Sequence, residues 1–145
     1  MREILFRGKR IDNGEWLEGS FLNDRDGSFY ICPAVSDISY GDGGNRRRIG
    51  CWYKVDPSTV GQYTGLKDKN GKRIFEGDIV AQNWYDHDEP SDDSFGEVVF
   101  CEYDCSFSVM DIQKDGIIPL GICHAYHWES EVIGNIHDNS ELLEE

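Results

Sequence analysis

The 145-residue sequence has no long hydrophobic run. No window approaches the ~18 consecutive apolar residues of a membrane helix, and residues 1–4 do not open the apolar core of a signal peptide. Long amphipathic patterns are missing as well, since no segment longer than about a dozen residues keeps apolar side chains at i, i+3 and i+4. These absences predict a soluble, cytoplasmic protein that makes no use of a membrane.

Basic residues are scarce: 14 Lys and Arg stand against 28 Asp and Glu, a net charge of −14. Residues 1–73 carry 13 basic and 10 acidic side chains, a net of +3, whereas residues 74–145 carry one and 18, a net of −17. Such a field repels nucleic acid and attracts basic proteins. We therefore expect a protein partner rather than nucleic acid, and the uneven division predicts homo-oligomers that weaken with salt.

Disulfide signatures are lacking too. The five cysteines are an odd number in a chain without an export signal, which favours thiols in a reducing compartment. Cys101, Cys105, Cys123 and His127 have side chains suited to tetrahedral zinc, although the three-residue spacer between the first two departs from the usual two. We favour a structural role for these side chains and expect no metal and no cofactor, with zinc as the alternative.

The sequence does contain a series of short β-prone runs separated by turn residues. Asn13-Gly14 lies between two such runs, which is a strong hairpin signal because type I′ turns need positive φ. The pattern predicts an all-β fold, β-rich with at most one or two short helices: a small SH3-like barrel or a sandwich of antiparallel hairpins. We expect strands at 3–11, 15–22, 28–32, 51–55, 60–65, 79–81, 96–103, 106–110, 116–120 and 131–136, loops at 36–50 and 86–94, and a helical turn at 140–144 capped by Asn139 or Ser140.

The length suits a single domain over residues 1–145, and the alternative is two β subunits divided near 74–95. No nucleophile with its base, and no cofactor motif, is recognisable, so we expect neither an enzyme nor catalytic residues. Residues 65–73 approach a phosphate-binding loop but have five residues between their glycines and no Ser or Thr after Lys72. A polar hairpin turning at Asn70-Gly71 is the better interpretation.

Aromatic residues with basic neighbours occur at Trp16 and Tyr53, a pattern of single-strand nucleic-acid binding that the net charge argues against. A run of three arginines suits phosphate or carboxylate groups, although adjacent charges are more often a solvated loop. The binding candidates from the sequence are Arg46, Arg47, Arg48, Trp16 and Tyr63.

Three stretches are characteristic: MREILFRG at 1–8, QYTGLKDKNGK with FEGDIV at 62–72 and 75–80, and EVIGNI with ELL at 131–136 and 141–143. Together they resemble the YopX family of phage and prophage proteins over essentially the whole chain. The resemblance implies an origin in a phage or prophage and a mainly β fold with barrel character, and it implies no catalytic residues.

The middle motif also has a structural explanation. Gly65 and Gly71 suit positions of positive φ, and Gly77-Asp78 suits a tight turn before the following strand. We therefore expect a non-enzymatic phage accessory protein that binds a host or phage protein through its β surface. The first alternative is an acidic DNA mimic that occupies a host DNA-binding protein, and the second is a small metal-dependent enzyme.

Overall fold

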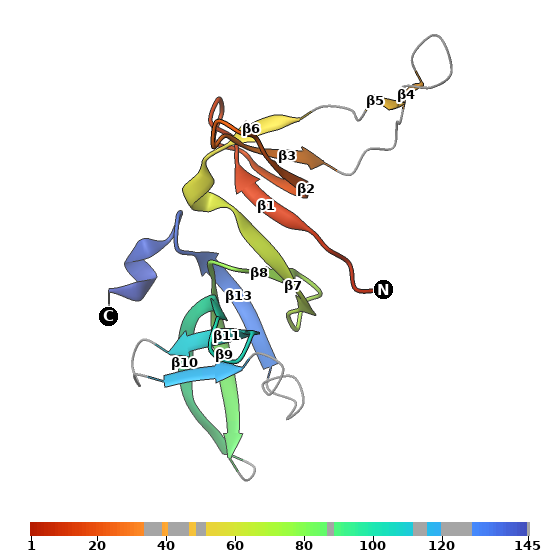
Figure 1. The fold of residues 1–145 in the computed structure, drawn as a ribbon. Coiled ribbons are helices and arrows are strands. Elements are labelled where there is room, and N and C mark those ends of the chain that lie inside the picture. Colours follow the sequence, from red (N-terminus) through yellow and green to blue (C-terminus); the bar gives the residue numbers. More distant parts are fainter. Residues whose placement is uncertain are drawn as a thin grey trace. The chain divides into compact units, whose positions relative to one another are not determined.

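The computed structural model describes residues 1–33, 39–40, 47–48, 52–86, 89–111, 116–119 and 129–144 (Figure 1). These residues form strands and two short 3₁₀ helices, so the predicted all-β fold is confirmed. By its internal contacts the chain divides into two compact units, Met1–Gln62 (unit 1) and Tyr63–Glu145 (unit 2). The division lies inside β7 (Gly61–Lys67), ahead of the 74–95 region named above.

Unit 1 is built on an antiparallel sheet with the strand order β6-β3-β2-β1. The predicted first hairpin is present, with Lys9 opposite Trp16 and Gly14 at a φ of +73° in the turn. β1 also pairs with the first two residues of β7. The elements are β1 (Phe6–Lys9), β2 (Trp16–Asn23), β3 (Phe29–Pro33), β6 (Tyr53–Val55) and the 3₁₀ helix η1 (Pro57–Thr59).

The first and last strands of unit 1's own sheet, β1 and β6, are joined by backbone contacts at the end of β1. Arg10 forms a β-bridge with Val55, and the amide of Ile11 donates a hydrogen bond to the carbonyl of Lys54 at 3.2 Å. The strand order therefore returns from β1 to β6. This closure gives unit 1 the barrel character that the sequence predicts.

The core of unit 1 contains Ile31 and Val55, both with 0 % of their surface exposed. A row of three phenylalanines packs beside it, with the Phe21 ring 5.2 Å from Phe6 and 5.0 Å from Phe29 between ring centroids. Aromatic contacts of this kind bury large areas, which a small barrel needs in order to be stable.

Two glycines in the first hairpin are required by close packing. A Cβ on Gly8 would lie 3.0 Å from a methyl group of Val55, and a Cβ on Gly19 would overlap the carbonyl oxygen of Cys32. β2 and β3 therefore approach each other at Gly19 more closely than a side chain permits.

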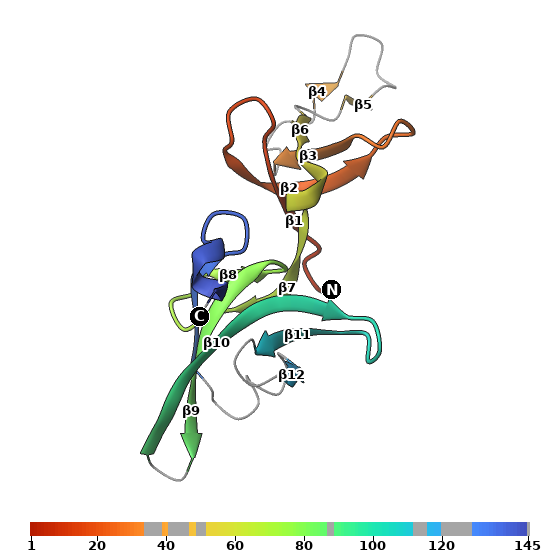
Figure 2. The same cartoon turned by 90° about the vertical axis from the view of Figure 1, so that its left-hand side faces the viewer.

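Unit 2 contains the rest of β7, which forms a hairpin with β8 (Arg73–Phe75), and a five-stranded antiparallel sheet (Figure 2). The sheet has the order β12-β11-β10-β9-β13. Its strands are β9 (Asp78–Asp86), β10 (Glu89–Cys101), β11 (Ser106–Asp111), β12 (Gly116–Pro119) and β13 (Glu129–Asn135). Its core consists of Ile74, Val80, Val98 and Val109, with Leu66, Phe107 and Val132 packed against them.

Two buried carboxylates hold the motif at 62–80 in place. Asp68 accepts hydrogen bonds from the amides of Asn70 (2.9 Å) and Lys72 (2.8 Å) on one oxygen and from the amide of Val132 (3.0 Å) on the other. It thereby shapes the β7–β8 turn and ties that turn to β13. Asp78, which is 1 % exposed, accepts from the amide of Phe75 at 2.8 Å and closes the turn between β8 and β9.

The glycines of the same motif adopt the backbone conformations that the sequence predicts. Gly65, Gly71 and Gly77 have φ values of +89°, +80° and +82°. The amide of Gly77 donates to the carbonyl of Val98 at 2.8 Å, and its carbonyl accepts from the amide of Ile136 at 2.9 Å. The turn is thus hydrogen-bonded on both sides within unit 2.

The segment expected as an acidic loop at 86–94 is instead mostly strand. β9 runs to Asp86, β10 begins at Glu89, and the two pair as far as that end. Strand pairing satisfies the backbone hydrogen-bonding groups whatever the side chains are. A prediction based on amino-acid composition therefore does not detect it. The loop expected at 36–50 likewise contains a short pair of strands, β4 (Ser39–Tyr40) and β5 (Arg47–Arg48).

The predicted terminal helical turn is present as the 3₁₀ helix η2 (Ser140–Leu143). Asn139 occupies its N-cap position without a capping side-chain hydrogen bond. Its side-chain oxygen accepts from the amide of Asn135 at 3.3 Å instead, so it braces the turn that precedes the helix.

Candidate functional site

Two of the four candidate zinc ligands lie among the described residues. Cys101 is half-buried at the end of β10, and Cys105 is exposed in the following turn at a φ of +54°. Cys123 and His127 fall outside the described residues. Among the residues that the structure does describe, no three His, Cys, Asp or Glu side chains gather as a metal site would require.

The binding candidates are spread over both units. Arg46 lies outside the described residues, and the backbone of Arg47 and Arg48 forms β5. Tyr63 is 4 % exposed, with its ring 5.6 Å from that of Phe75, so it belongs to the core of unit 2.

Trp16, the remaining binding candidate, lies among basic side chains in unit 1. Arg7 and Lys9 point to the same side of β1, because alternate residues of a strand share a face. The Arg7 guanidinium lies 4.9 Å and the Lys9 ammonium 5.8 Å from the centre of the Trp16 ring. These are cation–π distances, and Arg7 is only 9 % exposed. The arrangement stabilises the hairpin from within.

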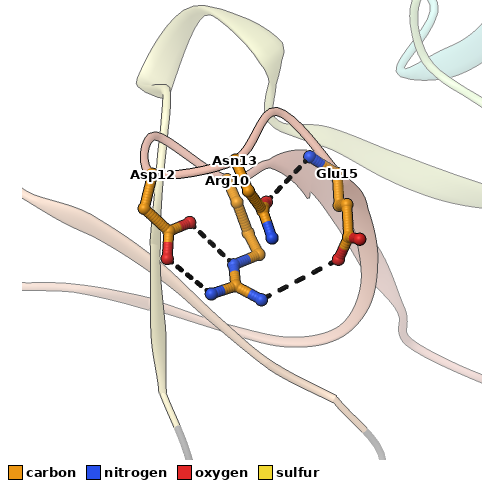
Figure 3. Close-up of polar contacts among 4 residues, drawn as sticks. All are labelled: Arg10, Asp12, Asn13 and Glu15. Carbon is orange, nitrogen blue, oxygen red and sulfur yellow. Dashed lines mark hydrogen bonds and ion pairs between the residues drawn. The ribbon is translucent and has the colours of Figure 1, made fainter.

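A second cation–π contact lies beside it, where Arg10 stands over the ring of Tyr53 at 4.3 Å. The guanidinium donates to both carboxylate oxygens of Asp12, at 2.8 Å and 2.5 Å, and lies 3.9 Å from Glu15 (Figure 3). The side chain of Asn13 accepts from the amide of Glu15 at 3.0 Å and shapes the turn. The turn between β1 and β2 thus holds Arg10 in one orientation.

The contacts around Arg10 shift the pKa values of the groups involved. The hydrogen bond from Arg10 lowers the pKa of Asp12, and the same bond raises the pKa of Arg10. In the turn between β2 and β3, the pKa of Asp26 is lowered first by the Ser28 amide and also by the charge of Lys54. Arg10 and Lys54 therefore each have a carboxylate nearby, Asp12 for the first and Asp26 for the second.

A pocket of about 350 Å³ opens next to this group in unit 1. It lies where the end of β1 meets the start of β6, so the closure of the barrel creates it. Ile11, which lines it, is 56 % exposed. The size is within the range of small-molecule and side-chain pockets, roughly 300–1,000 Å³. The lining residues are Ile11, Asp12, Trp52, Tyr53 and Lys54.

The pocket offers chemistry for binding. Two aromatic residues and an isoleucine give it an apolar lining, and an aspartate and a lysine line it as well. None of these side chains is a nucleophile paired with a base. The sequence signalled Tyr53 through its basic neighbours, but only the return of β6 to β1 places it beside Ile11 and Asp12.

The described residues include no helix with the length and apolar character that crossing a membrane requires. No protein in the curated collection of sequences matches the chain. Among solved structures, protein EF1440 from Enterococcus faecalis is similar, with 26 % identity and a TM-score of 0.63 over 99 % of this chain and 100 % of that chain. The sequence profile described as YopX protein matches residues 5–144. Since this match spans nearly the whole chain, the protein belongs to the YopX family.

Proposed function

We propose that the protein is a non-enzymatic phage or prophage accessory protein whose unit 1 binds a host or phage protein through the pocket beside Arg10. The observation that supports it is the pocket itself: about 350 Å³ with walls from Trp52, Tyr53 and Ile11. Binding sites for protein partners concentrate their energy in such aromatic pockets, where a single side chain is fully desolvated.

Arg10 prepares this pocket for binding. Its contacts with Asp12 and Glu15 fix the guanidinium over Tyr53 before any partner arrives. A wall that is already ordered loses little side-chain entropy on binding, which favours affinity.

The test is site-specific photo-crosslinking in lysate of an infected or lysogenic host. A photoreactive amino acid replaces Ile11 in one variant and Leu22 in another. Leu22 is 46 % exposed in β2 of the same unit and does not line the pocket. One protein crosslinked from position 11 and absent at position 22 is the expected result. Equal products from both positions, or none from position 11, would overturn the proposal.

An acidic DNA mimic is our second proposal, supported by the charge of unit 2. That unit carries five basic and 19 acidic residues, a net of −14, whereas unit 1 carries nine of each. Asp68 and Asp78 are buried on backbone amides and so do not imitate phosphates. If the protein is a DNA mimic, added duplex DNA should displace the protein that it captures from the lysate. Capture that does not change when DNA is added would exclude the DNA-mimic proposal.

A further inference from the structure

We infer that the face of the unit 2 sheet around Glu97 receives a cationic side chain, lysine or arginine, from a basic partner protein. This face belongs to unit 2 and therefore goes beyond the pocket of the proposed function. The setting of Glu97 in the sheet, its lack of a counter-charge and the charge of unit 2 support this occupant.

Glu97 lies on β10, the central strand of the sheet, and has apolar neighbours on its face. It is opposite Ile79 of β9 and Met110 of β11, and residues directly opposite each other share a face of a sheet. Ile79 is fully buried, and Met110 is 39 % exposed. Phe95 and Val99, two residues away on either side along β10, share the same face and are half-buried. The half-buried carboxylate is therefore bordered by apolar side chains.

Glu97 has no counter-charge among the residues that the structure describes. Burial raises its pKa, and neither a hydrogen bond nor a neighbouring cation of the described chain offsets that effect. Asp68 differs, because three backbone amides outweigh its burial. Burying a carboxylate without a partner costs free energy, and an opposite charge within about 4–6 Å favours its ionised form. A basic side chain of a partner would supply that charge.

The composition of unit 2 favours a cation from another protein. Residues 74–113, which include β9, β10 and β11, contain no Lys or Arg. Four of the five basic residues of the unit lie in the β7–β8 hairpin, where Lys69 already pairs with Glu131 at 3.0 Å. The fifth, Lys114, falls outside the described residues. With 19 acidic residues against these five, the unit attracts basic protein surfaces.

The apolar neighbours suit the stem of a long basic side chain. Lysine and arginine bury their methylene groups along apolar surface and keep the charged end at a polar group. Met110, which is partly exposed opposite Glu97, offers such a surface, and its flexible thioether adapts to different contacts. A neutral or acidic side chain would leave the carboxylate without a counter-charge.

The test is a titration of the full chain with two blocked tripeptides, Leu-Lys-Leu and Leu-Gln-Leu, which differ only at the central residue. The backbone amide shifts of Glu97 and Met110 report binding by nuclear magnetic resonance. We expect saturable shifts at both amides with the Lys peptide, and an affinity about fivefold lower with the Gln peptide. Equal affinities, or shifts that spread over the acidic residues without saturating, would overturn the inference.

Two variants that remove the same charge locate the effect. Glu97→Gln should abolish the preference for the Lys peptide. Glu102→Gln, at an exposed position in the turn after β10, is the matched control and should keep the affinity within about twofold. A preference that survives in Glu97→Gln, or that both variants lose equally, would contradict the assignment to Glu97.

Urea denaturation separates a binding role from a structural one. A half-buried carboxylate without a counter-charge does not stabilise the free fold, so Glu97→Gln should unfold at the same urea concentration as the natural chain or at a higher one. A lower midpoint would show that Glu97 makes a stabilising contact within the chain, and the inference would fall.

Light scattering tests whether a second copy is the occupant instead. Equal masses for the natural chain and for Glu97→Gln are the expected result. A mass that falls on substitution would identify a second copy at this face and would overturn the assignment to another protein. These outcomes are independent of the crosslinking at position 11, because that position lies in unit 1.

Discussion

Gly19 leaves no room for a side chain in the described part of unit 1. Its Cβ would overlap a backbone oxygen of β3 rather than a flexible side chain, so the two strands must separate to accept Gly19→Ala. We expect a loss of about 3 kcal/mol in the free energy of unfolding. Urea denaturation measures it. Ser20→Ala, at the exposed neighbouring position, should stay within about 0.5 kcal/mol, and equal midpoints for both variants would contradict the packing argument.

Asp68 gives unit 2 a dependence on pH. Burial, the strongest influence, raises its pKa, but the amides of Val132, Lys72 and Asn70 together outweigh burial and the pKa is lowered. A carboxyl whose folded pKa lies below its unfolded pKa stabilises the fold above the unfolded value, near ~3.9, and loses that contribution as pH falls through the folded value. We therefore expect stability to fall as the solution is acidified below about pH 4.

The variant Asp68→Asn tests this dependence. It should lose roughly 2–3 kcal/mol at pH 7, because charge-assisted hydrogen bonds from three amides are weakened. In denaturant titrations between about pH 6 and pH 2, a range about two units wide on either side of the unfolded pKa, its stability should change less than that of the natural chain. Glu102→Gln, at an exposed turn position, is the control and should follow the natural chain. A parallel pH dependence in all three proteins would contradict the role of Asp68.

At the scale of elements, the turn between β8 and β9 is the joint of unit 2, because Gly77 is hydrogen-bonded to β10 on one side and to the residue after β13 on the other. Gly77→Ala forces a side chain into positive φ, which costs about 1 kcal/mol, and disturbs both bonds, for a total of roughly 2 kcal/mol. Hydrogen exchange should show faster exchange at the amide of Ile136. Gly71 has nearly the same φ but open space around it, so Gly71→Ala should cost only the about 1 kcal/mol of the positive φ. The amide of Ile136 should then remain protected from hydrogen exchange.

The sequence predicts elements well wherever local chemistry decides them. Asn13-Gly14 and Gly71 mark turns because only a few residues tolerate positive φ, and the structure has both hairpins. It fails for the acidic segment at 86–94, where pairing between β9 and β10 overrides composition. The sequence also does not indicate that the carboxylates of Asp68 and Asp78 accept hydrogen bonds from backbone amides inside unit 2. A carboxylate in a polar turn is expected to be solvated until its amide partners are known.

For the whole molecule, the net charge belongs to unit 2, but four of that unit's five basic residues lie together in the β7–β8 hairpin: Lys67, Lys69, Lys72 and Arg73. Attraction between such a hairpin and the acidic surface of a second copy would be screened by salt. We expect light scattering to show association at low ionic strength and a monomer at about 0.5 M salt, where the Debye length falls below roughly 5 Å. A constant mass across this range would contradict the prediction.

The candidate site shows the limit of prediction at this scale. Basic neighbours in the sequence indicate Trp16 and Tyr53 as candidates. The sequence does not indicate that the pocket forms between the end of β1 and the start of β6. Which residues meet there is decided by the return of the last strand to the first, and this depends on the whole sheet rather than on any local pattern.

The closure between Arg10 and Val55 has a consequence for when the protein can act. The first hairpin needs only neighbouring residues and forms early, whereas the bridge to β6 requires a long stretch of chain to fold back, with the loop entropy that this costs. A nascent chain or one cut between β3 and β6 therefore has the Arg10 turn without the pocket. Under the proposed function, recognition would be confined to finished molecules, and a bound partner, by favouring the closed ring, would protect unit 1 against unfolding.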